Sequence, residues 1–166
     1  MDRPFFSIVI ASYNDKKNLR FCLSSIGEQK FYDYEILISD GGSTDGTLEY
    51  LSSGEIANLA WFKSEADLGI YDALNMAFRQ AQGEWLLVLG ADDRLLDRHA
   101  LSRAADLIIQ FRKPPAIAYG DLFISSGGRG TFKTYPDFNV FKDKYWGGGV
   151  YSSPISFRKC SVFDQC

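Results

Sequence analysis

The stretch Gly83–Arg94, with the sequence GEWLLVLGADDR, decides the fold of this chain. Its centre, Trp85–Leu89, is an uninterrupted apolar run bounded by glycines, and this pattern is typical of a strand buried on both faces. Such strands form parallel α/β sheets. Asp92 and Asp93 follow directly, at the carboxyl end of the strand, where open α/β sheets bind their ligands.

The adjacent carboxylates of Asp92 and Asp93 have two interpretations. Two like charges side by side repel each other, so a cation or a ligand that neutralises them stabilises the pair. In the first interpretation they hold a divalent metal ion and, through it, a phosphate. In the second they belong to a solvated turn before the next helix, since paired aspartates are common in turns. This stretch alone leaves both open.

Strands and helices are predicted to alternate along most of the chain. Buried-strand runs are found at Phe5–Ala11, Tyr34–Ser39, Leu59–Lys63 and Trp85–Leu89. Helices are expected to end near Gln29, Leu51, Gln82 and the Lys113–Pro115 breaker. This alternation predicts an α/β fold with a mostly parallel central sheet flanked by helices. The strand-like runs Ala116–Ser125 and Thr131–Tyr135 predict a mixed or antiparallel C-terminal edge.

Local signals predict how the helices begin, end and pack. The expected N-terminal caps are Asn14 or Asp15, Thr44 or Asp45, and Asp97. Gly83 is expected at the C-cap of the third helix, and Trp146–Gly149 is expected to be a loop. The apolar stripe expected to be buried on the third helix is Ile70, Leu74, Ala77, Phe78 and Ala81.

Composition narrows the class of protein. The 166 residues suffice for one domain with a sizeable core, and the formal net charge of -3 argues against a nucleic-acid binder. The N-terminal apolar run is too short for a membrane span and unlike a signal peptide, which predicts a cytoplasmic location. The cysteines, Cys22, Cys160 and Cys166, are scattered and odd in number, which argues against a disulfide framework. We expect Cys22 to pack as a small apolar residue.

The loop after the first strand excludes two large classes of nucleotide-binding protein. Ser12–Lys17 contains no glycine, whereas a dinucleotide-binding fold needs Gly-x-Gly-x-x-Gly at this place. The chain also has no GxxxxGK[ST] run. NAD-dependent enzymes and P-loop NTPases are therefore disfavoured.

The predicted strand ends carry groups suited to a nucleotide diphosphate. The first strand ends in Ala11, Ser12 and Tyr13, and the second ends in Asp40. A carboxylate near an aromatic ring can hold a planar base by stacking and by accepting its N–H. The aspartate pair further along the same edge can hold Mg²⁺ or Mn²⁺, which commonly share oxygen ligands with phosphates.

Three stretches together resemble the family 2 inverting glycosyltransferases with a GT-A fold. They are FFSIVIASYNDKKNLRFCLSSI, YEILISDGGSTDGT and SEADLGIYDALNMAFRQAQGEWLLVLGADDRL, in this order from about Phe5 to Leu95. The resemblance implies a single nucleotide-sugar-binding domain over residues 1–166, with a Rossmann-like GT-A sheet. Members of the family tend to be longer, so the domain is expected to be truncated before the full acceptor-binding part.

The resemblance also implies roles for the strand-end residues. Ala11–Tyr13 would line the nucleoside pocket, and Asp40 would hydrogen-bond the base, usually uracil. Asp93 matches the last aspartate of the DxD motif and would bind the metal, Mg²⁺ or Mn²⁺. Asp92 matches the variable middle position beside the donor nucleotide. Where the family often has Asn-Ser-Asp-Asp, this chain has Gly-Ala-Asp-Asp, which changes the groups that can read the sugar hydroxyls.

The run Asp67–Asn75, DLGIYDALN, resembles a subset of the family in which this segment lies near the donor diphosphate and sugar. Asp72 and Asn75 are about one helical turn apart and share a face. They are predicted to position the donor. A polar helix end is the alternative, and the sequence does not separate the two.

As a family property, the resemblance implies transfer of a sugar with inversion from a donor, usually a UDP-sugar, to a saccharide or lipid-linked acceptor. It places this reaction in polysaccharide or cell-envelope biosynthesis, with peripheral association at the cytoplasmic face of the membrane. The closing segment SPISFRKCSVFDQC resembles the stretch that precedes the catalytic base, so the base is expected beyond Cys166 and Asp164 is not assigned to it. Turnover by this chain alone is therefore not expected.

Two rival functions remain at this stage. A nucleotidyltransferase would need a glycine-rich basic loop after the first strand, where Ser12–Lys17 supplies only the lysines. A non-catalytic nucleotide-sugar binding module would bind the donor without acceptor-dependent release of nucleoside diphosphate.

Overall fold

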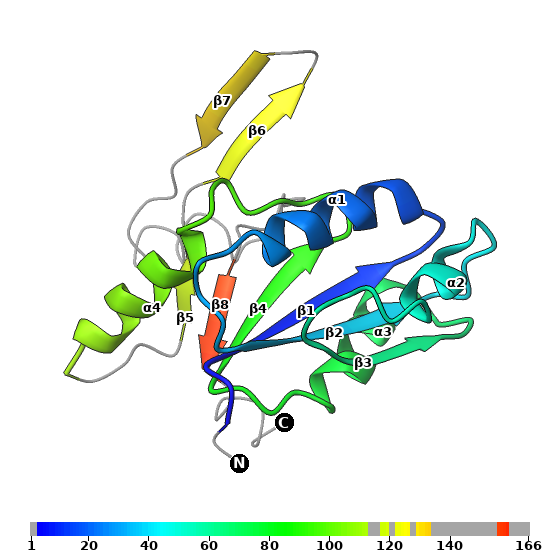
Figure 1. The fold of residues 1–166 in the computed structure, drawn as a ribbon, viewed down its shortest axis with the longest axis horizontal. Helices are drawn as coiled ribbons and strands as arrows, with labels where there is room; N and C mark the ends of the chain where they lie inside the picture. The colour runs from blue at the N-terminus through cyan, green and yellow to red at the C-terminus, as the bar shows by residue number, and fades with distance from the viewer. Residues whose placement is uncertain (1–2, 113–116, 120–121, 127–128, 134–155, 160–166) are drawn as a thin grey trace, which may run out of the picture.

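The computed structural model describes residues 3–112, 117–119, 122–126, 129–133 and 156–159 (Figure 1). The loop predicted at Trp146–Gly149 and the residue Asp164 lie outside the described residues. Among the described residues, no helix is both long enough and apolar enough to cross a bilayer.

The strands and helices follow the predicted alternation. The helices are α1 (Lys16–Gly27), α2 (Thr47–Leu51), α3 (Ile70–Phe78) and α4 (Ala100–Gln110). The strands are β1 (Phe6–Ser12), β2 (Tyr34–Asp40), β3 (Leu59–Ser64), β4 (Trp85–Gly90), β5 (Ile117–Tyr119), β6 (Leu122–Ser126), β7 (Arg129–Lys133) and β8 (Ser156–Lys159). The bounds of β1 to β4 agree with the predicted runs to within one residue at each end.

The main sheet has the strand order β3-β2-β1-β4-β8-β5. Strands β3, β2, β1 and β4 are parallel, and β8 runs antiparallel to both β4 and β5. The predicted α/β fold with a mixed C-terminal edge is therefore confirmed. The sequence analysis missed β8, because Ser156–Lys159 has no apolar run and joins the sheet through backbone pairing with a distant strand.

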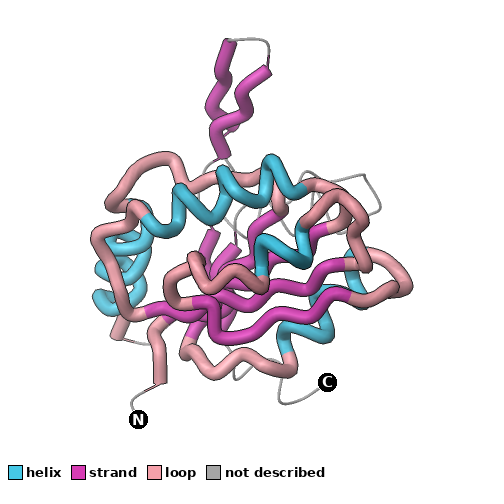
Figure 2. The backbone as a smooth tube through the Cα atoms, turned by 45° about the vertical axis from the view of Figure 1, so that its right-hand side comes forward, coloured by secondary structure: helices cyan, strands magenta, loops and turns pink. Residues whose placement is uncertain are grey.

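The predicted strand Ala116–Ser125 is wrong in one respect, because it is divided into β5 and β6. Strand β5 belongs to the main sheet, whereas β6 pairs with β7 in a separate two-stranded antiparallel sheet. Figure 2 shows this hairpin projecting away from the layers of the main sheet. The division is a tertiary feature that the apolar pattern of the run does not reveal.

The sheet is buried on both faces, which explains the uninterrupted apolar runs. One core lies between the sheet and helices α1 and α4, with Phe6, Ile8 and Ile10 of β1 pointing into it. A smaller core on the opposite face includes Val9 and packs against α3 through Ala77. The helix predicted to end before Lys113–Pro115 is present as α4, and it buries Leu101, Ala105 and Ile108 against the sheet.

Helix α3 is shorter than predicted, but most of its predicted apolar stripe does face the sheet: Ala77 is buried, and Leu74, Phe78 and Ala81 pack against the smaller core. It ends at Phe78 rather than near Gln82, and its most buried residues are Ala73 and Ala77. Ile70, predicted to be buried, is 59% exposed. The small alanine side chains let α3 lie close to the sheet, and this close approach leaves Ile70 at the solvent side of the first turn.

The predicted caps of α1 and α2 lie at the starts of these helices, but their hydrogen bonds differ from simple N-caps. Asp15 is the N-cap residue of α1, yet its carboxylate accepts from the Asn18 side chain instead of capping the helix. The Lys16 N–H is satisfied by Asp45, which also accepts from the N–H of Thr47 at the start of α2. One carboxylate therefore serves the N-termini of two helices.

The N-terminus of α4 also differs from the prediction. Its N-cap residue is His99, which makes no side-chain cap. Asp97 lies two residues earlier, where its carboxylate accepts from the His99 N–H and from the Arg103 guanidinium. Asp97 thus orders the turn that leads into the helix.

Gly83 is not the C-cap of α3, because Arg79 holds that position. Instead, Gly83 lies against β1, where its N–H donates to the Ser7 hydroxyl at 2.8 Å. A Cβ at Gly83 would lie 2.6 Å from the Ser7 nitrogen and 2.8 Å from the Phe6 carbonyl carbon. The close approach of two backbones, and not a left-handed conformation, requires glycine here.

We predict that Gly83→Ala destabilises the fold by about 1–3 kcal/mol, because the new methyl group must displace the backbone of β1. The control is Gly27→Ala at the end of α1, where a Cβ meets nothing within 4 Å. That substitution should be neutral or stabilising by less than about 1 kcal/mol, since alanine has the higher helix propensity. Urea denaturation followed by the fluorescence of the buried Trp85 measures both, and equal stabilities of the two variants would contradict the prediction.

Candidate functional site

The predicted site residues meet at one edge of the sheet, as parallel pairing requires. Ser12 is paired with Asp40, and Asp40 with Ser64, at the carboxyl ends of β1, β2 and β3. On the other side of β1, Ala11 is paired with Gly90, the last residue of β4. Asp92 and Asp93 follow two and three residues later. The structure therefore brings Ala11, Ser12, Asp40 and the aspartate pair together.

Asp40 is a buried carboxylate, with only 1% of its surface exposed. Its oxygens accept from the Ser43 N–H at 2.9 Å, from the Ser43 hydroxyl, and from the Ser64 hydroxyl at 2.6 Å. Its backbone carbonyl accepts from the Glu65 N–H. Asp40 thus organises the loops that follow β2 and β3, and its hydrogen bond to a base stays a prediction.

The loops after β1 and β2 are clamped to each other. The Gly41 N–H donates to the Ser12 carbonyl at 2.9 Å, and the Asn14 N–H donates to the Ser43 hydroxyl at 2.7 Å. In return, the Asn14 side-chain oxygen accepts from the Thr44 N–H at 2.8 Å. Asn14 has a positive φ of 48°, a conformation that asparagine tolerates better than most residues. These hydrogen bonds hold the two loops together at the carboxyl edge of the sheet.

Of the residues in this clamp, Asn14 and Thr44 were predicted only as helix caps, and their hydrogen bonds between the two loops were not predicted. The signal was present in the polar stretches around Asn14 and Ser43, which have the composition of turns. The pairing joins positions 29 or 30 residues apart, and no local pattern indicates it.

The ring of Tyr13 is available at this edge, with 66% of the residue exposed. A Cβ at Gly41 would lie 3.1 Å from Tyr13 Cδ2 and 3.0 Å from Asp67 Oδ2. The Gly41 backbone therefore lies between an aromatic ring and a carboxylate. Asp67, which the sequence analysis named only as the start of a motif, thus belongs to the site. Its Oδ1 atom accepts from the Gly69 N–H at 2.8 Å.

Asp92 and Asp93 converge on the end of β4. A Cβ at Gly90 would lie 2.8 Å from Asp92 Oδ1 and 3.2 Å from Asp93 Oδ2. The Gly90 N–H donates to Asp93 Oδ2 at 2.8 Å. Because Gly90 has no side chain, both carboxylates can fold into the space beside it.

The electrostatics of Asp93 favour a nearby cation. Burial raises the pKa of Asp93, the charge of Asp92 raises it further, and the Gly90 N–H opposes the rise. Two convergent oxygens that repel each other suit Mg²⁺ or Mn²⁺. Within the part of the chain that the structure describes, no group of three or more His, Cys, Asp or Glu side chains could hold a metal. A metal here would therefore depend on ligands from a bound diphosphate.

Cys22 of α1 lies beneath the aspartate pair and is fully buried. Burial, followed by the charges of Asp93 and Asp92, raises the pKa of its thiol to about 12. A thiol that stays protonated is a poor metal ligand. The prediction that Cys22 packs as a small apolar residue is confirmed, since it belongs to the main core.

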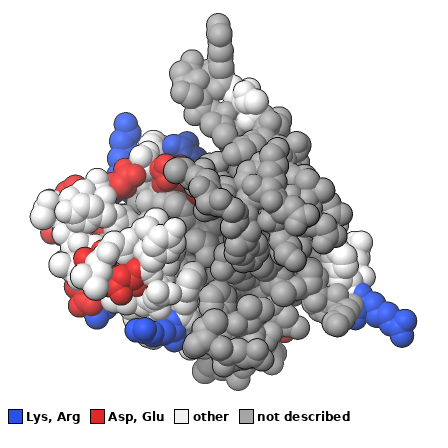
Figure 3. All heavy atoms as spheres, turned by 180° about the vertical axis from the view of Figure 1, so that it is seen from behind, with Lys and Arg blue, Asp and Glu red and all other residues white. Residues whose placement is uncertain are grey.

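Asp72 and Asn75 lie on α3, close to the loop that begins at Asp67. Asp72 Oδ2 accepts from the Leu68 N–H at 3.1 Å, which closes the first turn of the helix. Asn75 is exposed. Their roles in positioning a donor stay predictions. In the view from behind, acidic side chains gather at the end of the molecule where β2 and β3 end (Figure 3).

A parallel sheet with convergent carboxylates and clamped loops at its carboxyl edge is typical of an α/β protein that binds its ligand at this edge. The sequence model of the family named Glycosyl transferase family 2 matches residues 7–165. The chain therefore belongs to glycosyltransferase family 2, a family of enzymes.

Named relatives agree with this assignment. A PGL/p-HBAD biosynthesis glycosyltransferase of Mycobacterium bovis (strain BCG / Pasteur 1173P2) is 38% identical over 128 residues, which cover 76% of this chain and 50% of that protein. Glycosyltransferase AglE of Haloferax volcanii is 34% identical over 93 residues, covering 54% of this chain and 31% of AglE. The chain thus spans half the length, or less, of these two relatives.

Solved structures share the fold. TarS 1–349 of S. aureus in complex with UDP superposes with a TM-score of 0.74 at 24% identity, covering 96% of this chain and 48% of TarS 1–349. The mannosyltransferase PcManGT of Pyrobaculum calidifontis, in complex with GDP-Man and Mn²⁺, has a TM-score of 0.70 at 21% identity. The match covers 99% of this chain and 47% of PcManGT. At these identities the similarity establishes the fold alone.

We predict that Asp93→Asn stabilises the metal-free protein at neutral pH. The pKa of Asp93 is higher in the folded protein than its ordinary value of 3.8. Between these two pKa values the folded protein binds more protons than the unfolded chain, so it loses stability as the pH rises from the ordinary value through the folded-state value. The asparagine oxygen can still accept from the Gly90 N–H. The urea midpoint of Asp93→Asn should therefore exceed that of the wild type at pH 7, in the presence of a chelator.

The difference should narrow as the pH falls toward 3.8, the ordinary pKa of the group. Asp92→Asn is the matched control, since Asp92 is exposed, and its effect should be smaller. A lower midpoint for Asp93→Asn than for the wild type would show that burial of this charge does not weaken the fold.

Proposed function

We propose that this chain is the donor-binding part of an inverting glycosyltransferase that takes its sugar from a UDP-sugar. The observation that carries the proposal is the convergence of Asp92 and Asp93 at the same sheet edge as the hydrogen-bonded loops and the exposed ring of Tyr13. The TarS structures, which include complexes with UDP and with UDP-GlcNAc, support the choice of nucleotide. The Mn²⁺ in the PcManGT structure supports a divalent metal, Mg²⁺ or Mn²⁺.

In this proposal the nucleoside lies against the clamped loops. The base stacks on Tyr13, and Ala11 and Ser12 line the floor of the pocket. The Ser12 hydroxyl is buried and has no hydrogen-bond partner among the described groups, so it is available to a ligand. Asp40 accepts a hydrogen bond from the N–H of the base, and this bond replaces one of the hydrogen bonds that Asp40 accepts from Ser43 or Ser64.

The diphosphate lies further along the edge, toward β4. Asp93 holds the metal, assisted by Asp92, and the metal neutralises charge on the leaving nucleoside diphosphate when bound. Asp72 and Asn75 position the sugar and the diphosphate from the start of α3. The catalytic base that deprotonates the acceptor is expected beyond Cys166, in the part that longer relatives contain.

The acceptor is proposed to be a saccharide or a lipid-linked molecule of the cell envelope. The 38% identical mycobacterial relative, named for PGL/p-HBAD biosynthesis, supports a role in glycoconjugate assembly. We place the protein in the cytoplasm, at the cytoplasmic face of the membrane, where such acceptors are assembled.

We predict that UDP binds the chain in the presence of Mn²⁺ and binds Asp93→Ala at least about tenfold more weakly, because a charged ligand bond is lost. Calorimetric titration of UDP, with and without Mn²⁺, measures both affinities. Asp106→Ala, an exposed aspartate on α4, is the control and should bind like the wild type. Wild-type binding that is equally strong with and without Mn²⁺ would remove the metal from the proposal, and no binding in any condition would refute it.

We also predict that Tyr13→Ala weakens UDP binding by about tenfold, because a base stacked on an aromatic ring contributes roughly 1–3 kcal/mol. Tyr13→Phe keeps the ring and should bind within about twofold of the wild type, since the hydroxyl is not needed for stacking. The same titration measures both variants. Unchanged affinity in Tyr13→Ala would place the base elsewhere on the sheet edge.

A further inference from the structure

The outward face of α1 carries a cluster of cations around an exposed aromatic ring. Lys16, Lys17, Arg20 and Phe21 come from the helix, and Arg94 reaches the cluster from the loop after β4. We call these five residues the α1 basic face. The three residues Lys17, Arg20 and Arg94 are exposed, and Phe21 is 45% exposed. Phe21 is thus a partly exposed apolar residue on a face that carries four cations.

Two of the four cations, Arg20 and Arg94, lie over aromatic rings. The Arg94 guanidinium lies 4.4 Å from the centre of the Phe21 ring, and that of Arg20 lies 5.4 Å from the Tyr50 ring of α2. Across the described ranges the ion pairs are Lys63–Glu65 and Arg103–Asp97. None of the four cations on the α1 basic face therefore has a carboxylate at ion-pair distance.

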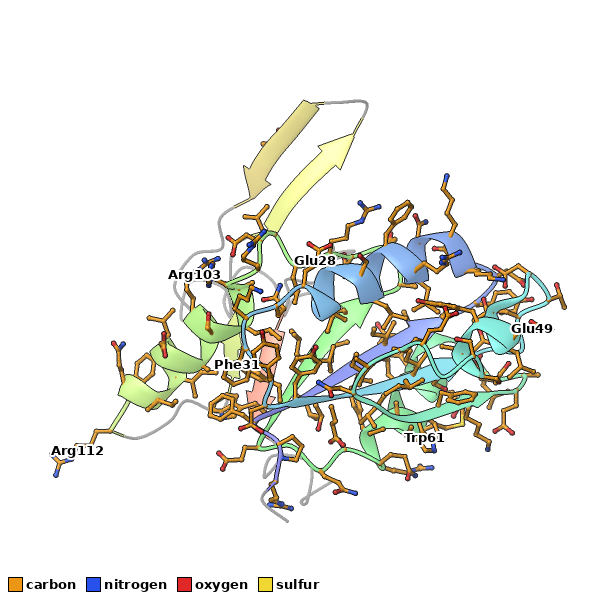
Figure 4. All side chains as sticks on the ribbon, viewed as in Figure 1. Glu28, Phe31, Glu49, Trp61, Arg103 and Arg112 are labelled. Atoms are coloured by element: carbon orange, nitrogen blue, oxygen red, sulfur yellow. The ribbon has the colours of Figure 1, made fainter. Side chains whose placement is uncertain are left out.

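Acidic groups border this face without neutralising it. Asp45 is directed to the backbone N–H groups of Lys16 and Thr47. Glu28 projects from the far end of α1, and Glu49 lies on α2 (Figure 4). Three of the four cations thus lie on the first turns of α1, with Glu49 near Lys16 and with Asp92 and Asp93 directly before Arg94 in the chain.

We propose that the α1 basic face binds the surface of a membrane that contains anionic phospholipids. Lys and Arg side chains that surround an exposed aromatic ring suit this surface, because cations meet the phosphates while the ring enters the headgroup layer. A nucleic acid would call for a longer basic stripe than one helix provides. The Lys16 N–H is bonded to the loop after β2, so the bound membrane lies beside the clamped loops.

The test is sedimentation of the full chain with vesicles of phosphatidylcholine containing phosphatidylglycerol, and with vesicles of phosphatidylcholine alone. The wild type should bind the anionic vesicles, and added salt should weaken the binding because it screens the charges. Each cation near an anionic surface strengthens binding by about fivefold. The double variant Lys17→Glu/Arg20→Glu should therefore bind at least about tenfold more weakly.

The matched control is Arg79→Glu/Arg112→Glu, which makes the same change of charge at exposed positions at the ends of α3 and α4. It should keep most of the vesicle binding. Phe21→Ala should lose the part of the binding that persists in high salt. Thermal melting of each variant verifies that the fold is intact.

Several outcomes would overturn the proposal. They are equal binding to both kinds of vesicle, no binding at low salt, and an equal loss in the control variant. Competition by glycerol phosphate at low concentration would also overturn it, since that result indicates a site for a free phosphate. This inference rests on the membrane-face location in the proposed function. Its failure is distinguishable from failure of the proposed donor binding, because vesicle binding requires neither UDP nor a metal and UDP titration requires no vesicle.

Discussion

The buried carboxylate of Asp40 is the interaction on which the candidate site depends. A charge that is 1% exposed is stable in the fold only when hydrogen-bond donors compensate its lost hydration. Ser43, in the loop after β2, and Ser64, the last residue of β3, supply those donors. The loops after β2 and β3 are therefore held in place, and Asn14 joins the loop after β1 to them. Tyr13 is presented on the loop after β1.

A second buried carboxylate, at the opposite end of the sheet, also accepts hydrogen bonds from separate segments of the chain. Glu35 of β2 is buried and accepts from the Ser7 hydroxyl and from the N–H groups of Gln82 and Gly83. These hydrogen bonds hold the segment between α3 and β4 against the sheet, directly before β4 begins. Because β4 leads to the aspartate pair, this distant carboxylate contributes to the position of the site without touching it.

The loop that carries the aspartate pair is also fastened to α1. The Ser25 hydroxyl accepts from the Leu95 N–H, and the buried Gln29 side chain donates to the Asp97 carbonyl and accepts from the Leu101 N–H. The repulsion between Asp92 and Asp93 is thus imposed by a rigid frame. A frame of this kind would hold the two carboxylates ready for the proposed cation, at a cost in stability, and it connects them to the helix that carries the α1 basic face.

The sequence by itself determined the order and bounds of β1 to β4, since strands buried on both faces are continuous apolar runs. It also placed Ala11, Ser12, Asp40 and the aspartate pair at one edge, because parallel strands bring their carboxyl ends together. Only the tertiary structure decided the partners of Asp45, the early end of α3, the exposure of Ile70 and the insertion of β8 between β4 and β5. The physical reason is the range of the interactions. Apolar periodicity is local, whereas hydrogen bonds between distant loops, close backbone contacts such as that at Gly83, and edge pairing depend on the assembled fold.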